Sequence, residues 1–142
     1  MTAWTSDELN KIGTAEEPQI ASLRRDDTLR NPVTIWVVRV GDDLYIRPIH
    51  GRTSAWFRGT QVRHEGQIRA GGVEKEVAFV EETNPDINEQ IDAAYRTKYH
   101  RYAASIISTT VSPEARSATI KLMPRQTNSQ FNNQRIEKEK YI

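Results

Sequence analysis

The sequence predicts a mainly β protein of the α+β class, a small antiparallel barrel with flanking helices. About six segments have the composition of β-strands and lie next to one another along the chain, and two or three short segments carry helix caps. The chain has 142 residues, enough for one domain with its own hydrophobic core. We expect this domain over residues 1–124. Residues 125–142, rich in Gln, Asn, Lys and Glu, predict a mobile polar tail or an arm that becomes ordered on a partner.

The first elements are a short helix and a strand. Thr5 and Glu8 have the spacing of a capping box, in which each side chain bonds the other's backbone N–H. Gly13 is expected to end this helix. The segment from Ile20 to Leu23 predicts the first strand.

A hairpin follows. Val33 to Val40 is rich in β-branched and aromatic residues on both alternating faces, which predicts one strand covered on both sides. Gly41-Asp42 suits a two-residue turn and leads to the paired strand from Leu44 to Arg47. Pro48 lacks a backbone donor and should end that strand.

The middle of the chain continues in β-structure. Ala55 to Arg58 predicts one helical turn or a loop, stopped by Gly59, and Glu65-Gly66 predicts a turn. Three further strands are expected, namely Gln67 to Ala70, Val73 to Val80 and Ser117 to Met123.

Two later helices have clear start signals. Asn84-Pro85 combines an asparagine cap with a proline in the first turn, and Ser112-Pro113 repeats the device before the last strand. After Pro85, apolar side chains recur at helical spacing and predict one buried face (Ile87, Ile91, Tyr95 and Tyr99).

Charge is concentrated in the middle of the chain. The net charge is only +1, but the segment from Leu44 to Arg69 contains a single acid, Glu65, and five arginines: Arg47, Arg52, Arg58, Arg63 and Arg69. Guanidinium groups bind phosphate and carboxylate in a bidentate manner, so this segment predicts a local anion site. Arg63 and Arg69 could instead decorate strand faces and pair with the acids of Glu74 to Glu82.

Several classes of protein are disfavoured. The chain has no cysteine, which excludes disulfides, thiolate nucleophiles and iron–sulfur ligation. Its three histidines, His50, His64 and His100, lie far apart, so no metal site is expected. The first residues lack signal-peptide character and no apolar run has the length of a membrane span, so we expect a cytoplasmic protein with no membrane partner.

Two segments resemble a known family. Thr34 to Tyr45 and Ala94 to Tyr99 resemble a bacterial family of domains of unknown function. That family looks like a branch of the split β-barrel flavin-binding superfamily, which includes pyridoxamine-phosphate-oxidase-like proteins and deazaflavin-dependent nitroreductases. Trp56-Phe57 followed by Gln67 to Glu81 is similar to the Trp-Tyr turn and two strands of the nitroreductases. The resemblance covers residues 4–124.

The resemblance implies a flavin- or deazaflavin-linked oxidoreductase of small molecules. It implies a split β-barrel that forms a homodimer and binds FMN or a deazaflavin. The aromatic wall beside the ring system would be Trp56, with Arg58 nearby. The cofactor phosphate would be held by an arginine and hydroxyl cluster, which corresponds here to Arg47, Arg52, Thr53 and Ser54.

Two other functions stay open. The nitroreductase pattern has proline and asparagine around its aromatic dipeptide where this chain has Ser54 and Gly59. This departure favours a cofactor-free barrel that binds a small anionic ligand, as a sensor or as an enzyme with His50 or Tyr99 as acid and base. A nucleic-acid-binding module using the same arginines is the third hypothesis and is disfavoured by the small net charge.

Overall fold

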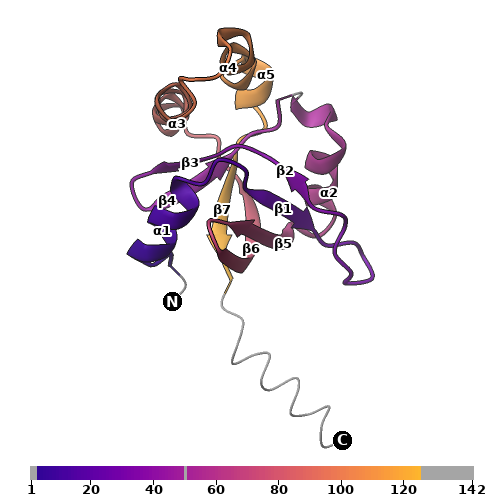
Figure 1. The fold of residues 1–142 in the computed structure, drawn as a ribbon. Coiled ribbons are helices and arrows are strands. Elements are labelled where there is room, and N and C mark those ends of the chain that lie inside the picture. The colour runs from indigo at the N-terminus through magenta and orange to yellow at the C-terminus, as the bar shows by residue number, and fades with distance from the viewer. Residues whose placement is uncertain (1–2, 50, 126–142) are drawn as a thin grey trace, which may run out of the picture.

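The structure is a computed structural model that describes residues 3–49 and 51–125 (Figure 1). Within these residues, seven strands form one antiparallel sheet in the order β2-β1-β5-β6-β7-β4-β3. The strands are β1 (Gln19–Ser22), β2 (Val33–Thr34), β3 (Val37–Val40), β4 (Asp43–Ile46), β5 (Glu65–Ala70), β6 (Val73–Glu81) and β7 (Ile120–Pro124).

Helices lie around the sheet at two places that matter for the site. α3 packs on β3, with α4 next to α3 and α5 next to α4, whereas α2 lies beside β1 and β2 (Figure 1). The helices are α1 (Ser6–Gly13), α2 (Ala55–Arg63), α3 (Pro85–Lys98), α4 (Ala104–Thr110) and α5 (Pro113–Arg116), with a 3₁₀ turn η1 (Gly51–Thr53) before α2.

The two edge strands are consecutive in the chain. β2 ends at Thr34 and β3 begins at Val37, so only Ile35 and Trp36 join the two edges of the sheet. Three Cα steps of 3.8 Å span at most about 11 Å. The sheet must therefore curl until its edges approach each other. This arrangement confirms the α+β class and the antiparallel split barrel.

The expectation of one strand from Val33 to Val40 was wrong. A continuous strand would keep β2 and β3 on one neighbour, but β2 pairs with β1 and β3 pairs with β4. The chain leaves the ladder at Ile35, whose N–H bonds the Pro18 carbonyl oxygen at 2.9 Å. The composition of the segment correctly indicated β-structure. Closure of the barrel divides the segment into two strands.

Apolar side chains pack on both faces of the β3–β4 hairpin, as the sequence indicated. Val37 and Leu44 belong to the core inside the barrel. Val38 and Tyr45 point to the other face and pack with the apolar side of α3. Both sets are nearly inaccessible to solvent, so the hairpin is held between two cores.

The predicted caps of the first and third helices and the predicted Gly41-Asp42 turn are confirmed. Thr5 accepts a hydrogen bond from the Glu8 N–H at 3.1 Å, and Glu8 accepts one from the Thr5 N–H at 2.9 Å. Asn84 caps α3 by accepting from the N–H groups of its first turn. Gly41 adopts a positive φ of 63° in the hairpin turn.

Two glycines were misinterpreted from sequence. Gly59 does not stop a helical turn but lies inside α2, and Gly66 lies inside β5 rather than in a turn. A Cβ at Gly66 would lie 2.1 Å from the Ala21 carbonyl oxygen, and a Cβ at Gly59 would lie 2.8 Å from Ser22 Oγ. Both glycines therefore allow close approach to β1. Helix α4 lacks a capping side-chain bond and was not predicted.

Candidate functional site

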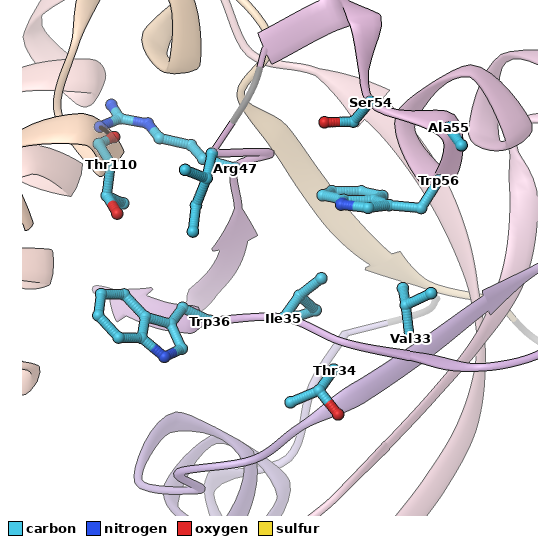
Figure 2. A pocket seen from close by; sticks show the side chains of 10 residues that line it. Val33, Thr34, Ile35, Trp36, Arg47, Ser54, Ala55, Trp56 and Thr110 are labelled. Atoms are coloured by element: carbon cyan, nitrogen blue, oxygen red, sulfur yellow. Dashed lines mark hydrogen bonds between the residues drawn. The ribbon is translucent and has the colours of Figure 1, made fainter. Parts of the chain in front are cut away.

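A pocket of about 450 Å³ lies beside the short connection that closes the barrel. We call it the Trp36–Trp56 pocket. Its walls include Val33, Ile35 and Trp36 from the connection and Ser54 and Trp56 from the start of α2 (Figure 2). The two tryptophans lie at different ends of the pocket in Figure 2, and both are half-buried. A mainly apolar pocket with aromatic ends suits a flat ring system.

The first turn of α2 adds polar groups to this pocket. Ser54 is the N-cap residue, and its hydroxyl makes no capping hydrogen bond with the helix backbone. The first turn contains no acidic residue, so the positive end of the helix dipole is not neutralised there. Trp56 packs edge-on against buried Phe57, with ring centroids 6.5 Å apart. The start of α2 can therefore present a fixed indole together with donors for an anion.

Arg47 touches the pocket, but its charged group is bound within the protein. Nε donates to Thr119 Oγ1 at 2.9 Å. Nη1 donates to Asp92 Oδ1 at 2.5 Å and to the Thr110 carbonyl oxygen at 3.3 Å. Nη2 donates to the carbonyl oxygen and the Oδ1 of Asn88 at 3.1 and 2.8 Å. All five N–H groups of the guanidinium are used, so none is left for a phosphate in this arrangement.

The other arginines of the predicted cluster separate in space. Arg52 donates to Glu81 Oε1 at 2.7 Å and to the Ser117 carbonyl oxygen at 3.0 Å. Exposed Arg58 donates to the carbonyl oxygen of Thr53 at 3.2 Å. Neither arginine lines the Trp36–Trp56 pocket. The fold thus distributes the basic segment rather than gathering it at one point.

Arg63 and Arg69 pair with acids. Arg69 Nε lies 2.8 Å from Glu74 Oε2, which confirms the predicted contact with the acidic strand. Arg63 pairs instead with Asp27 and Glu65. The two arginines therefore belong to surface ion pairs and not to the pocket.

Tyr99, one of the two residues predicted to act as an acid or base, packs against the Trp36 wall of the pocket. Its hydroxyl accepts from the Val37 N–H and donates to the Val37 carbonyl oxygen, both at 3.2 Å. Its ring stacks on Trp36 with centroids 3.9 Å apart. Burial raises the pKa of Tyr99, so the hydroxyl stays protonated at neutral pH. His50, the other predicted acid or base, lies outside the described residues.

Two further α3 side chains hold the same connection. Tyr95 donates from its hydroxyl to the Trp36 carbonyl oxygen at 2.9 Å, and Lys98 Nζ donates to the Val37 carbonyl oxygen at 2.6 Å. Burial lowers the pKa of Lys98 to about 8. These contacts fix the backbone that carries Trp36, a pocket wall.

A second pocket, which sequence reasoning missed, adjoins the first. It has a volume of about 280 Å³ and shares Val33, Ala55 and Trp56 with the Trp36–Trp56 pocket. Its remaining lining includes two arginines, Arg24 and Arg30, from the loop that leaves β1. We call it the Arg30 pocket. In sequence these arginines are far from the basic segment, and only the packing of α2 on β1 brings them to Trp56.

Comparison with known proteins identifies the family. Residues 8–122 match the family described as "Uncharacterized protein conserved in bacteria (DUF2255)". The chain belongs to this family. The match covers most of the barrel and confirms the resemblance to a bacterial family of unknown function.

Three solved structures share the fold of this DUF2255 protein. An F420 reductase superposes with a TM-score of 0.52 at 14% identity, covering 84% of this chain and 93% of that one. A conserved hypothetical protein from Mycobacterium tuberculosis has a TM-score of 0.58 at 10% identity, covering 88% and 83%. HutZ, the heme storage protein from Vibrio cholerae, has a TM-score of 0.50 at 12% identity, covering 80% and 84%. These identities show a common fold alone.

No curated protein sequence matches this chain. In the part of the chain that the structure describes, no helix is long and apolar enough to cross a membrane. Across residues 3–49 and 51–125, no three His, Asp or Glu side chains gather in a way that could hold a metal ion.

Proposed function

We propose that this protein binds a flavin or a deazaflavin in the Trp36–Trp56 pocket and acts as an oxidoreductase on small molecules. The observation that carries the proposal is the pocket itself, with apolar walls, a tryptophan at each end and the start of α2 at its side. A split-barrel F420 reductase has the same fold, which supports a deazaflavin as the cofactor class.

The residues present fit such a cofactor. A volume of about 450 Å³ lies in the range of pockets that bind small molecules and cofactors. Val33, Ile35 and Trp56 offer apolar contact to a tricyclic ring. The Ser54 hydroxyl and the N-terminal turn of α2 offer donors to an anionic group. The set therefore combines ring contact with anion binding.

Each part of the protein has a distinct task in this proposal. A bound flavin or deazaflavin would supply the hydride-transfer chemistry. Trp56 and Trp36 orient the ring and exclude water from it. Ser54 binds an oxygen of the cofactor. Tyr99 holds the Trp36 wall through its contacts with Val37.

Of the four residues expected to hold the cofactor phosphate, this proposal keeps one. Ser54 keeps its role because it lines the pocket. Arg47 and Arg52 instead hold the strand end and α5 in place, because protein groups accept their hydrogen bonds. Thr53 and Arg58 connect η1 to α2 next to the pocket. The hypothesis that His50 acts as an acid or base remains a prediction.

The proposal is tested by spectroscopy of the native protein. The absorbance spectrum and the mass of small molecules that copurify should reveal a flavin or deazaflavin. Stripped protein should then bind FMN or F420, with quenching of tryptophan fluorescence. Failure of all three ligands, FMN, riboflavin and F420, to bind at millimolar concentration would remove the proposal.

A cofactor-free barrel that binds a small anion is the second candidate function. It is favoured by the internal bonding of Arg47 and Arg52, the two arginines expected to bind a cofactor phosphate. Calorimetric titration with small phosphates and carboxylates distinguishes the two functions. Anion binding without affinity for FMN, riboflavin or F420 would favour this candidate, whereas ring-dependent binding would favour the oxidoreductase.

We further propose that the protein is a homodimer, as the split-barrel resemblance implies. Ile49 is 38% exposed and lines the Trp36–Trp56 pocket, so an apolar side chain at the pocket is available to a second subunit. Light scattering coupled to size-exclusion chromatography should give twice the mass of one 16.3 kDa chain. A monomer at tens of micromolar would contradict this.

A further inference from the structure

Arg30 is a half-buried cation without a counter-charge. Its backbone is fixed, because its N–H donates to the Ser22 carbonyl oxygen at 2.9 Å. Its side-chain Nε is fully buried and has no hydrogen-bond partner. Within residues 3–49 and 51–125, no carboxylate forms an ion pair with Arg30. A buried charged donor without an acceptor is unfavourable, so its presence points to an acceptor that comes from outside the chain.

The surroundings of Arg30 leave room for this side chain. Gly59 in α2 faces it, and a Cβ at that position would lie 3.0 Å from Arg30 Nε and 3.1 Å from Arg30 Cδ. The same Cβ would lie 2.8 Å from the Oγ of Ser22, which also lines the pocket. The glycine that departs from the nitroreductase pattern therefore makes space for a guanidinium and a hydroxyl beside each other.

The Arg30 pocket has the composition of an anion site. Its polar lining consists of Arg24, Arg30, Asn31, Ser22 and Thr60, and no carboxylate lines it. Arg24 is held in place because its Nη1 donates to Thr28 Oγ1 at 3.1 Å and to the Leu29 carbonyl oxygen at 3.0 Å. Two arginine side chains from one loop thus border a space of about 280 Å³.

Nearby acids do not pair with Arg30, although Asp26 interacts electrostatically with Arg24. Asp26 and Asp27 belong to the same loop as the two arginines. Asp26 accepts hydrogen bonds from the N–H and hydroxyl of Thr28, and Asp27 pairs with Arg63. Neither aspartate lines the Arg30 pocket. The positive charge of Arg30 is therefore left for a ligand.

We propose that the Arg30 pocket binds the anionic group, a phosphate or a carboxylate, of the ligand whose ring lies against Trp56. The two pockets meet at Val33, Ala55 and Trp56, so one molecule can occupy both. The assignment of the ring rests on the proposed function. The assignment of the anion rests on Arg30 and its pocket and can be tested separately.

The first experiment compares FMN with riboflavin, which lacks the phosphate. The Arg30→Gln variant should bind FMN about tenfold or more weakly and riboflavin unchanged, because a hydrogen bond to a charged group is lost only for FMN. The control is Arg25→Gln, which removes the same charge from an exposed position in the same loop and should change neither affinity. Arg30→Lys keeps the charge but loses the planar guanidinium, so its loss of FMN affinity should be intermediate. This variant replaces Arg30→Gln in the test if the glutamine variant does not fold.

The second experiment does not need a flavin. Inorganic phosphate and glutamate are titrated separately into labelled wild-type protein while the Nε–Hε resonance of Arg30 is followed by NMR. A saturable shift with phosphate, glutamate or both supports the anion site and identifies which anion it prefers. No shift with either at tens of millimolar overturns it, even if riboflavin binds.

The outcomes separate the two proposals. Equal loss of FMN and riboflavin in Arg30→Gln, or no loss of either, would overturn the anion subsite and leave ring binding intact. If none of FMN, riboflavin and F420 binds, the proposed function fails and the NMR titration alone decides the subsite.

Discussion

Arg47 and Asp92 form a buried ion pair in which Nη1 of the arginine lies 2.5 Å from Oδ1 of the carboxylate. The Arg47 side chain is 0% exposed and that of Asp92 is 12% exposed. This pair joins the end of β4 to α3, and the carbonyl oxygen of Thr110 joins α4 to the same guanidinium. The residue expected to bind a ligand therefore holds the helices on the barrel.

Replacement of Asp92 should destabilise the fold. Asp92→Asn leaves the Arg47 charge buried without its counter-ion, and we expect a loss of about 3 kcal/mol or more in the free energy of unfolding. Urea denaturation followed by circular dichroism measures this. The matched control is Glu81→Gln, which breaks the exposed pair with Arg52 and should cost about 1 kcal/mol at most. Equal, small losses in both variants would mean that the Arg47 network does not stabilise the fold.

Replacement of Trp56 should weaken ring binding while the fold persists. Trp56→Leu keeps an apolar side chain but removes the aromatic face, and we expect roughly a tenfold loss of affinity for both FMN and riboflavin. Fluorescence of the bound flavin gives the affinities. Ile106→Ala, at a 40% exposed position away from the pocket, is the control. Unchanged affinity in Trp56→Leu would place the ring elsewhere.

Gly59→Ala should affect the phosphate and not the ring. The added Cβ would crowd Arg30 Nε and Ser22 Oγ at 3.0 and 2.8 Å, so these groups must move. Affinity for FMN should fall while affinity for riboflavin is kept, as measured by the same titrations. A fall in riboflavin affinity of the same size would show that the substitution acts on the ring pocket.

Lys98 should make stability depend on alkaline pH. Its pKa is lowered to about 8 in the folded protein because burial disfavours the charged form, whereas the unperturbed value is 10.5. Between these two values the unfolded chain binds more protons, so this residue's contribution to stability increases as pH rises. Below pH 8 Lys98 is protonated in both the folded and the unfolded state, so the folded protein bears the full cost of burying its charge.

The Lys98→Met variant isolates this effect. The difference in urea midpoint between wild type and variant should change in favour of wild type from pH 7.5 to 9.5. Both proteins contain the same tyrosines, so tyrosine ionisation cancels in this difference. A difference that is constant with pH would mean that Lys98 titrates as an exposed lysine.

Local sequence signals predicted much of the fold. Capping residues, such as Thr5 and Asn84, act within one turn, so their effect can be read from neighbouring positions. Gly66 and Gly59 could not be interpreted in this way, because the need for glycine comes from β1, a segment about 40 residues away in the sequence. The break of the Val33–Val40 segment likewise depends on where the two sheet edges meet.

The candidate site was predicted in part. Ser54 and Trp56, which the family resemblance indicated as site residues, both line the pocket from the start of α2. The sequence could not show which arginines bind protein groups and which are available to a ligand, because their partners are distant in the chain. Arg47, for example, bonds Asn88, Asp92 and Thr119. Arg30 had no local signal, and its proposed role rests on a buried Nε without a hydrogen-bond partner and on the absence of an ion pair with Arg30 among the described residues.

The most direct test of the central claim uses the indole N–H resonances of the protein's three tryptophans. Trp36 and Trp56 line the pocket, whereas Trp4 is 7% exposed and its indole N–H donates to the Leu122 carbonyl oxygen in the core. Addition of FMN or F420 should shift the signals of Trp36 and Trp56 and leave that of Trp4 in place. Unchanged signals from Trp36 and Trp56 at saturating ligand, or no saturation at millimolar concentration, would contradict the account.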